Sequence, residues 1–115
     1  MKKQNNKNLF NKVYKIVRDV PEGKVTTYGD ISMRLSSEVG VPSKRWARMV
    51  GFALHANTDS HTPCHRVVNK EGRIAPGFAF GGPDEQRKRL EAEGVRFLDR
   101  THVDLQKHAI SIHSS

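Results

Sequence analysis

The chain has one cysteine, Cys64, which is followed directly by His65 and Arg66. A thiolate is the reactive form of cysteine, and cationic or imidazole neighbours lower the pKa of a thiol. A histidine can also take the thiol proton, provided that a third group orients its ring. The pattern indicates a nucleophilic cysteine, and the alternative is a small buried apolar residue. A zinc site built from Cys64 with His61 or His65 is disfavoured because adjacent ligands give poor tetrahedral geometry, so we expect no metal and no cofactor.

A second pattern lies upstream, in a helix that we expect to begin with Ser43 as its cap and to end near His55. At about 100° per residue its apolar side chains share one face, formed by Trp46, Met49, Val50, Ala53 and Leu54. The opposite face carries Lys44, Arg48, Gly51 and His55. A glycine inside a helix costs about 1 kcal/mol relative to alanine, and close approach to a sugar–phosphate backbone would explain it. This face indicates nucleic-acid binding, with a solvated face and an incidental glycine as the alternative.

The elements that must position these groups are mostly helices. Apolar residues at helical spacing predict a helix over 8–20, and Pro21-Glu22-Gly23 ends it with turn chemistry. Thr27 is predicted to cap a short second helix, with Asp30 three residues further along. We expect a loop from Ser36 to Pro42 before the third helix. Two helices joined by a short loop, the second bearing cations, predict a helix-turn-helix unit.

The C-terminal half predicts shorter elements. Val67-Val68 and Ile74 flank a tight turn, which predicts two short paired strands. A glycine-rich loop over 77–82 precedes a last helix, which begins at Pro83 and stops at Gly94. Alternating apolar residues predict a small closing ribbon, formed by Val95, Phe97, Val103 and Leu105. The predicted fold class is mostly α with a minor β ribbon, in a winged-helix-like helix-turn-helix domain.

Length and composition set further limits. A chain of 115 residues suits one domain, with an ordered core over about 8–106 and a frayed tail from Lys107 to Ser115. Lys and Arg number 20 against 12 Asp and Glu, and the net charge of +8 favours a polyanionic partner, chiefly nucleic acid. No apolar run approaches the roughly 20 residues that span a bilayer. A single cysteine forms no internal disulfide, and the N-terminus lacks a signal-peptide pattern, so we expect a cytoplasmic protein. We also expect a monomer.

The segment from Pro63 to Val67 resembles the active-site motif of the O6-alkylguanine-DNA alkyltransferases, also called methylated-DNA–protein-cysteine methyltransferases. The resemblance extends over about residues 9–105 and rests on further matches at Pro21-Glu22-Gly23-Lys24-Val25-Thr26-Thr27-Tyr28-Gly29, Arg48-Met49-Val50-Gly51, Asn57 and Glu93-Gly94. Only the C-terminal domain of these proteins is matched. The resemblance implies that the partner is double-stranded DNA containing O6-alkylguanine.

The same resemblance implies how DNA would be held. The helix before Cys64 would enter the minor groove, with Gly51 against the DNA backbone. Arg48 would insert into the base stack and hold the space left by an extruded guanine, while Tyr28 would press on the adjacent phosphate. Flipping is required because an atom inside the duplex is out of reach of a side chain. Further DNA contacts would come from Lys44, His55 and Arg66.

The chemistry implied by the resemblance is a single alkyl transfer. Cys64 would accept the alkyl group from guanine O6, with His65 acting through water as the base. Glu93 would orient His65, and Asn57 would brace the turn before the cysteine. The pocket for the flipped base would be formed by Tyr28, Leu54, Phe78 and Phe80. The thioether product is a poor leaving group toward water, so the protein would act once.

The chain is also similar to the alkyltransferase-like proteins, which bind O6-alkylguanine without repairing it. In that group the cysteine is replaced, usually by tryptophan, whereas Cys64 is retained here. Alkyltransferases tend to carry tyrosine, often with serine, in the pocket wall, whereas Phe78, Ala79 and Phe80 precede Gly81-Gly82 here and provide no hydroxyl. The alternative function is therefore a lesion-binding protein that flags O6-alkylguanine for other repair proteins. A plain transcription factor is a third interpretation, but it leaves the Cys-His pair unexplained.

Overall fold

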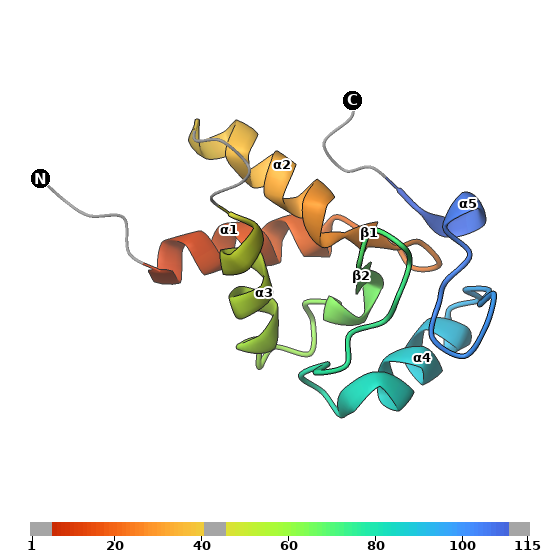
Figure 1. Ribbon diagram of the computed structural model, residues 1–115. Coiled ribbons are helices and arrows are strands. Elements are labelled where there is room, and N and C mark those ends of the chain that lie inside the picture. Colours follow the sequence, from red (N-terminus) through yellow and green to blue (C-terminus); the bar gives the residue numbers. More distant parts are fainter. Residues whose placement is uncertain (1–5, 41–45, 111–115) are drawn as a thin grey trace, which may run out of the picture.

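The computed structural model describes residues 6–40 and 46–110 (Figure 1). In chain order its elements are α1 (Asn6–Arg18), β1 (Thr26–Thr27), α2 (Tyr28–Val39), α3 (Ala47–His55), the 3-10 helix η2 (Cys64–Arg66), β2 (Val67–Val68), α4 (Gly82–Ala92) and α5 (Leu105–His108). Figure 1 shows α1, α2 and α3 grouped together, with the two strands between them and the α4–α5 part. The predicted class, mostly helical with a minor β component, is confirmed.

The three N-terminal helices enclose one apolar cluster. Val13, Ile16 and Val17 of α1 meet Ile31 and Leu35 of α2 in this cluster. From α3 it receives the predicted apolar face: Val50, Ala53 and Leu54 are buried, and Trp46 and Met49 pack partly buried against it. Burying each large apolar side chain contributes roughly 1.5–3 kcal/mol. The packing holds α3 with its opposite face outward.

The second helix begins as predicted and ends later than predicted. The Thr27 hydroxyl accepts a hydrogen bond from the Asp30 amide at 3.1 Å, which caps the first turn. The expected loop from Ser36 is wrong, because the helix continues through Val39 to Gly40, which has a φ of 74° and donates its N–H to the Ser36 carbonyl. A glycine in this left-handed conformation is a common helix stop. The predicted Ser43 cap lies outside the described residues, so the helix-turn-helix connection stays a prediction.

The strand pairing differs from the predicted hairpin. β2 pairs in parallel with β1, with Thr26 opposite Val67 and Thr27 opposite Val68. The turn after β2 does form, since the Gly72 amide donates to the Asn69 carbonyl at 2.9 Å. Ile74, the predicted second strand of the hairpin, instead donates its N–H to the Thr101 carbonyl. The pairing β1–β2 anchors η2, which carries the cysteine, directly before β2.

The C-terminal part has its own apolar cluster and a fixed tail. Leu90, Val95 and Val103 pack there with residues of the central segments, namely Val25, Val68 and Ile74. The predicted closing ribbon is reduced to a single antiparallel bridge between Phe97 and Val103. The predicted last helix is confirmed, with Pro83 in its first turn and Gly94 at a φ of 85° just beyond its end.

The expectation of a frayed tail from Lys107 is wrong for residues 107–110. His108 is buried, its Nδ1 lies 2.9 Å from the Gly23 carbonyl, and the Arg96 amide donates to its Nε2 at 2.9 Å. Because Nε2 accepts, the ring carries its proton on Nδ1 and donates to Gly23. Backbone hydrogen bonds join Val25 to the same segment on both sides. The tail therefore closes over the turn that leads into β1.

Within residues 6–40 and 46–110, no helix combines the length and apolar composition that crossing a bilayer requires.

Candidate functional site

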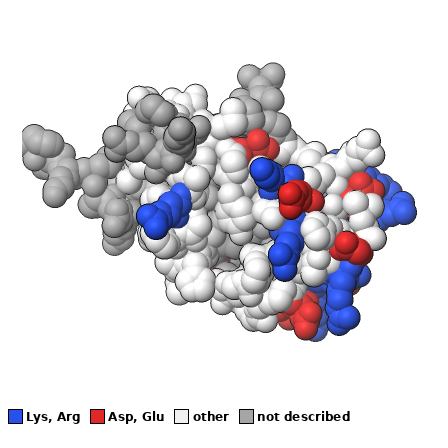
Figure 2. Space-filling model, in the orientation of Figure 1, with Lys and Arg blue, Asp and Glu red and all other residues white. Residues whose placement is uncertain are grey.

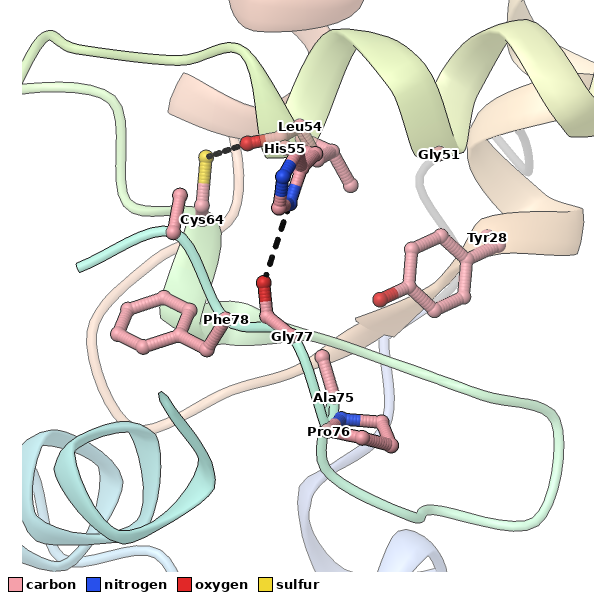
Figure 3. Close-up of a pocket in the computed structure, with 10 residues that line it drawn as sticks. Tyr28, Gly51, Leu54, His55, Cys64, Ala75, Pro76, Gly77 and Phe78 are labelled. Atoms are coloured by element: carbon pink, nitrogen blue, oxygen red, sulfur yellow. Dashed lines mark hydrogen bonds between the residues drawn. The ribbon is translucent and has the colours of Figure 1, made fainter. Parts of the chain in front are cut away.

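A pocket of about 220 Å³ lies between the outer side of α3, the start of α2 and the segment after residue 74 (Figure 3). Large and small side chains line it together: Tyr28, Gly51, Leu54, His55, Cys64, Ala75, Pro76, Gly77, Phe78 and Ala79. The volume is below the roughly 300–1,000 Å³ typical of sites for drug-sized ligands. A single nucleobase suits a space of this size better than a larger cofactor does.

The pocket brings together residues that the sequence pointed to from separate segments. Tyr28, Leu54, Cys64 and Phe78 all line it, together with Gly51 and His55 of the predicted DNA face. Figure 3 shows the Tyr28 hydroxyl directed into the space between α3 and the Ala75–Gly77 segment. Burial raises the pKa of Tyr28, so its phenol stays protonated and can donate a hydrogen bond.

Phe80 is a correction to the predicted pocket wall, because it does not line the pocket. Its ring instead packs on that of Phe78, with centroids 5.9 Å apart. The Arg89 guanidinium lies 5.2 Å from the Phe80 centroid and 5.4 Å from that of Phe78. Phe80 therefore supports the wall residue and does not face the occupant. Sequence reasoning also missed Ala75 and Pro76, because short loop segments of this kind carry no periodic signal.

Cys64 is a buried residue of the pocket lining. The residue is only 6% exposed, and its Sγ accepts a hydrogen bond from Asn57 Nδ2 at 3.0 Å. Burial raises the pKa of the Cys64 thiol to about 11, although the hydrogen bond from Asn57 opposes the shift. At neutral pH the sulfur is a thiol, and any transfer must remove its proton during the reaction.

Glu93 accepts hydrogen bonds from His65 and Arg66, the two residues that follow the cysteine. Its Oε2 accepts from His65 Nε2 at 2.7 Å, and Arg66 donates to both carboxylate oxygens at 3.0 and 2.8 Å. Burial raises the pKa of Glu93, but the hydrogen bonds from Arg66 and His65 outweigh it and leave the pKa below its ordinary value. The carboxylate is therefore charged and can only accept hydrogen bonds.

His65 is held as a neutral base by this arrangement. Burial lowers the pKa of His65, against the opposing effect of Glu93. Since Glu93 can only accept, the ring proton sits on Nε2, and Nδ1 keeps a lone pair. The resemblance implied that Glu93 orients His65, and their hydrogen bond is the geometry that such a role requires.

Arg66 was expected to contact DNA, and its position contradicts that expectation. Two of its nitrogens are bonded to Glu93, and Nη1 donates to the Val20 carbonyl at 2.7 Å. Its side chain is only 16% exposed. A guanidinium that is buried and paired in this way has little left for a phosphate, so Arg66 fixes Glu93 in place.

Asn57 lies in the turn where the resemblance placed it. Its Nδ2 donates to the carbonyls of Asp59 and Thr62 at 3.1 and 3.3 Å, and its Oδ1 accepts from the Asp59 amide at 2.9 Å. The same amide group reaches Cys64 Sγ. Asn57 therefore sets the shape of the turn and touches the sulfur.

Gln86 is a positioning residue that sequence reasoning missed. It is fully buried in α4, where its Oε1 accepts from the Ala75 amide at 2.7 Å. Its Nε2 donates to the carbonyls of His65 and Val67 at 3.1 and 3.0 Å. One side chain thus ties the pocket segment to η2. Its i, i+4 spacing with the buried Leu90 is a signal that could have found it.

The outward face of α3 carries Arg48, Gly51 and His55, all at least partly exposed. A Cβ added at Gly51 would meet nothing within 4 Å, so the described residues supply no reason for a glycine there. His55 Nδ1 lies 3.2 Å from the Gly77 carbonyl, which links the end of α3 to the pocket segment (Figure 3). Figure 2 shows basic and acidic side chains intermingled on the side of the molecule where α4 lies. The predicted contact Lys44 lies outside the described residues.

The fold and the pocket together define a domain of a known DNA-binding class. The family model described as "6-O-methylguanine DNA methyltransferase, DNA binding domain" matches residues 8–95, and the chain belongs to this family.

Relatives of two kinds share this domain. The chain is 44% identical over 88 residues to alkyltransferase-like protein 1 of Schizosaccharomyces pombe, covering 76% of each chain. It is 42% identical over 100 residues to the DNA base-flipping protein of Escherichia coli, covering 84% of this chain and 70% of that protein. It is also 30% identical over 89 residues to the methylated-DNA--protein-cysteine methyltransferase of Haemophilus influenzae, covering 76% of this chain and 45% of that enzyme.

Solved structures with DNA are similar to most of the chain. The crystal structure of S. pombe Atl1 in complex with damaged DNA containing O6-carboxymethylguanine matches with a TM-score of 0.70 and 35% identity, covering 96% of this chain and 98% of that one. The structure of Mycobacterium tuberculosis OGT in complex with DNA matches with a TM-score of 0.61 and 29% identity, covering 85% of this chain and 53% of that one.

Proposed function

We propose that the chain recognises O6-alkylguanine in double-stranded DNA by flipping the modified nucleotide into the pocket that Cys64 lines, and that it then transfers the alkyl group to Cys64. The observation that carries the proposal is that Cys64 lines one pocket together with Tyr28 and with Gly51 and His55 from the outward face of α3. A flipped base is the one part of a duplex that reaches such a pocket. The names of the similar proteins support lesion recognition.

The transfer step that we propose uses Asn57, which contacts the sulfur, and His65, which follows Cys64 in the chain. The thiol proton passes through water to the lone pair of His65 Nδ1, and the charge on Glu93 stabilises the imidazolium that forms. Sulfur bonds to the alkyl carbon as the bond from that carbon to guanine O6 breaks. The guanine oxygen keeps the electron pair, and the base is protonated back to guanine. Asn57 holds the sulfur during the step. The thioether is stable toward water, so each molecule reacts once.

A lesion sensor without chemistry is the second candidate, and two observations favour it. Burial raises the pKa of the Cys64 thiol to about 11, which makes the sulfur a reluctant nucleophile. The side chains of Ala75, Pro76, Phe78 and Ala79 also offer no donor for the lesion oxygen. In this case the protein would flip the base, hold it and flag it for other repair proteins.

One experiment separates the two functions. The protein is mixed with a duplex that contains one O6-methylguanine, and the Cys64 peptide is analysed by mass spectrometry after complete binding. Transfer predicts one added methyl group on Cys64 in the wild type and none in Cys64→Ser. Complete binding without an adduct, together with unchanged lesion affinity in Cys64→Ser, would select the sensor. Equal affinity for the modified and unmodified duplexes would contradict both.

A further inference from the structure

Phe52 of α3 is exposed although it is large and apolar. Its exposed fraction is 60%, compared with 65% for Leu98 and 46% for Met33, the other large apolar residues that stand out on the described surface. Isolated exposed apolar residues are normal and need no explanation by themselves. What distinguishes Phe52 is its neighbours, because it lies between Gly51 and His55 in the chain and both of these line the pocket.

The helical geometry places Phe52 on the outward face of α3. Four residues at about 100° each put it about 40° around the helix axis from Arg48, and one turn further along. The helix has no acidic residue from Ala47 to His55. Phe52 therefore extends the surface of Arg48, Gly51 and His55, which is the surface that the proposed function brings against DNA.

We propose that Phe52 contacts double-stranded DNA directly, as an apolar wedge in the minor groove beside the flipped nucleotide. The choice of this surface rests on the proposed function. Proteins that bend or open the minor groove insert apolar side chains between base steps. A phenylalanine also stacks on any base without reading its sequence.

The spacing gives Phe52 and Arg48 different tasks. Their side chains leave the helix about 6 Å apart, whereas neighbouring base pairs are about 3.4 Å apart. Arg48 fills the space of the extruded base in the proposed function. Phe52 then meets an adjacent base step or its sugar, where it keeps the duplex open without competing for that space.

The test compares Phe52→Ala with Leu98→Ala, which removes an equally exposed apolar side chain from the turn over 97–103. Affinities for an O6-methylguanine duplex and for the matched unmodified duplex are measured by fluorescence anisotropy over a range of salt concentrations. Stacking of this kind predicts that Phe52→Ala weakens binding about 5- to 150-fold. Leu98→Ala should change the affinity less than about twofold. Phe52→Trp should keep the affinity of the wild type, because tryptophan also stacks on bases. The slope of log affinity against log salt should not change, because phenylalanine neutralises no phosphate.

The outcomes separate this inference from the proposed function. A loss with Phe52→Ala on both duplexes supports the wedge even when the wild type shows no preference for the lesion, a result that would overturn only the proposed function. Affinities that stay within about twofold of the wild type on both duplexes would overturn the wedge. A concentration-dependent dimer in sedimentation that Phe52→Ala abolishes, with DNA affinity unchanged, would also overturn it and assign the side chain to self-association.

Discussion

Arg48 and Arg66 are both arginines close to the pocket, but Arg48 is exposed whereas Arg66 is mostly buried. Arg66 is buried, paired with Glu93 and bonded to the Val20 carbonyl. Arg48 is exposed on α3 and has no ion-pair partner within the described residues. The same contrast holds for the two regions around them. Glu93 is hydrogen-bonded to both His65 and Arg66. On the outward face of α3, Arg48, Gly51 and Phe52 are instead at least partly exposed.

The contrast indicates how this domain holds Cys64 and His65 in place. Side chains that position Cys64 and His65 are locked by hydrogen bonds from distant segments, as with Gln86 and Glu93. Residues proposed to meet DNA make few contacts of their own, and the fold depends little on them. Loss of a hydrogen-bonded side chain such as Gln86 or Glu93 should therefore destabilise the fold, while substitutions on the outward face of α3 should not destabilise it and should act on DNA binding.

Glu93→Ala should have the largest effect, and it should be on stability. The change leaves Arg66 and His65 partly buried without their partner, and breaking such a pair costs about 3 kcal/mol of unfolding free energy. Glu85→Ala is the control, because its ion pair with Arg89 is about one-third exposed and should contribute less than about 1 kcal/mol. Urea unfolding of both variants provides the measurement. Similar losses in the two variants would contradict the contrast between the regions.

The pH dependence of the same pair has a definite sign. The pKa of Glu93 is lowered in the folded protein, so its contribution to stability is full above the ordinary glutamate pKa and is lost as the pH falls below it. The wild type should therefore lose more stability than Glu93→Ala on acidification from pH 6 to roughly 3.

The thiol of Cys64 should show the next largest effect. With a pKa of about 11, it should react with iodoacetamide at a rate that still rises through pH 9 and 10, because the thiolate forms late. The raised pKa favours the folded state below the ordinary cysteine pKa, and this contribution is lost as the pH rises toward 11. The urea-unfolded chain is the control, because the pKa of its exposed thiol is about 8.5. A plateau near neutral pH in the folded protein would contradict the buried, protonated sulfur.

Arg48→Ala should act on DNA and leave the fold intact. If Arg48 holds the space of an extruded base, its removal should weaken binding of the O6-methylguanine duplex about tenfold, or about 1.4 kcal/mol. Affinity for the unmodified duplex should fall less, because only one phosphate or groove contact is lost there. Lys70→Ala, an exposed cation in the turn after β2, is the matched control. Equal losses on both duplexes would argue against an inserted Arg48.

Gly51→Ala should have the smallest effect, with opposite signs in the two assays. The structure leaves room for the added methyl group, so the variant should gain up to about 1 kcal/mol of helix stability. Its affinity for DNA should fall, because the methyl group keeps α3 from the sugar–phosphate backbone. Unfolding in urea and anisotropy on one preparation measure both quantities. An unchanged affinity would leave the glycine without a role in binding.

The local parts of this molecule were predictable from the sequence. Helical spacing in α1 and the apolar face of α3 follow from residues within a few turns, and so does the Thr27 cap with its hydrogen bond from the Asp30 amide. Likewise, the stop at Gly94 is a property of one residue and its neighbours. Such features need no knowledge of the rest of the chain.

The rest depends on contacts between distant segments. Arg66 looked like a DNA contact because its partner, Glu93, lies 27 residues further along. The raised pKa of Cys64 depends on such contacts too, since its largest cause is burial in an apolar cluster built from several segments. His108 closes on Gly23 across 85 residues, which no local pattern in the tail indicates.

A crystal structure of Cys64→Ser with a duplex that contains O6-methylguanine tests the central claim most directly. We expect the modified guanine to be rotated out of the helix into the pocket, with its methyl carbon in van der Waals contact with the serine hydroxyl that replaces the sulfur in this variant. A lesion that stays stacked in the duplex, or an extruded base held away from position 64, would contradict the account.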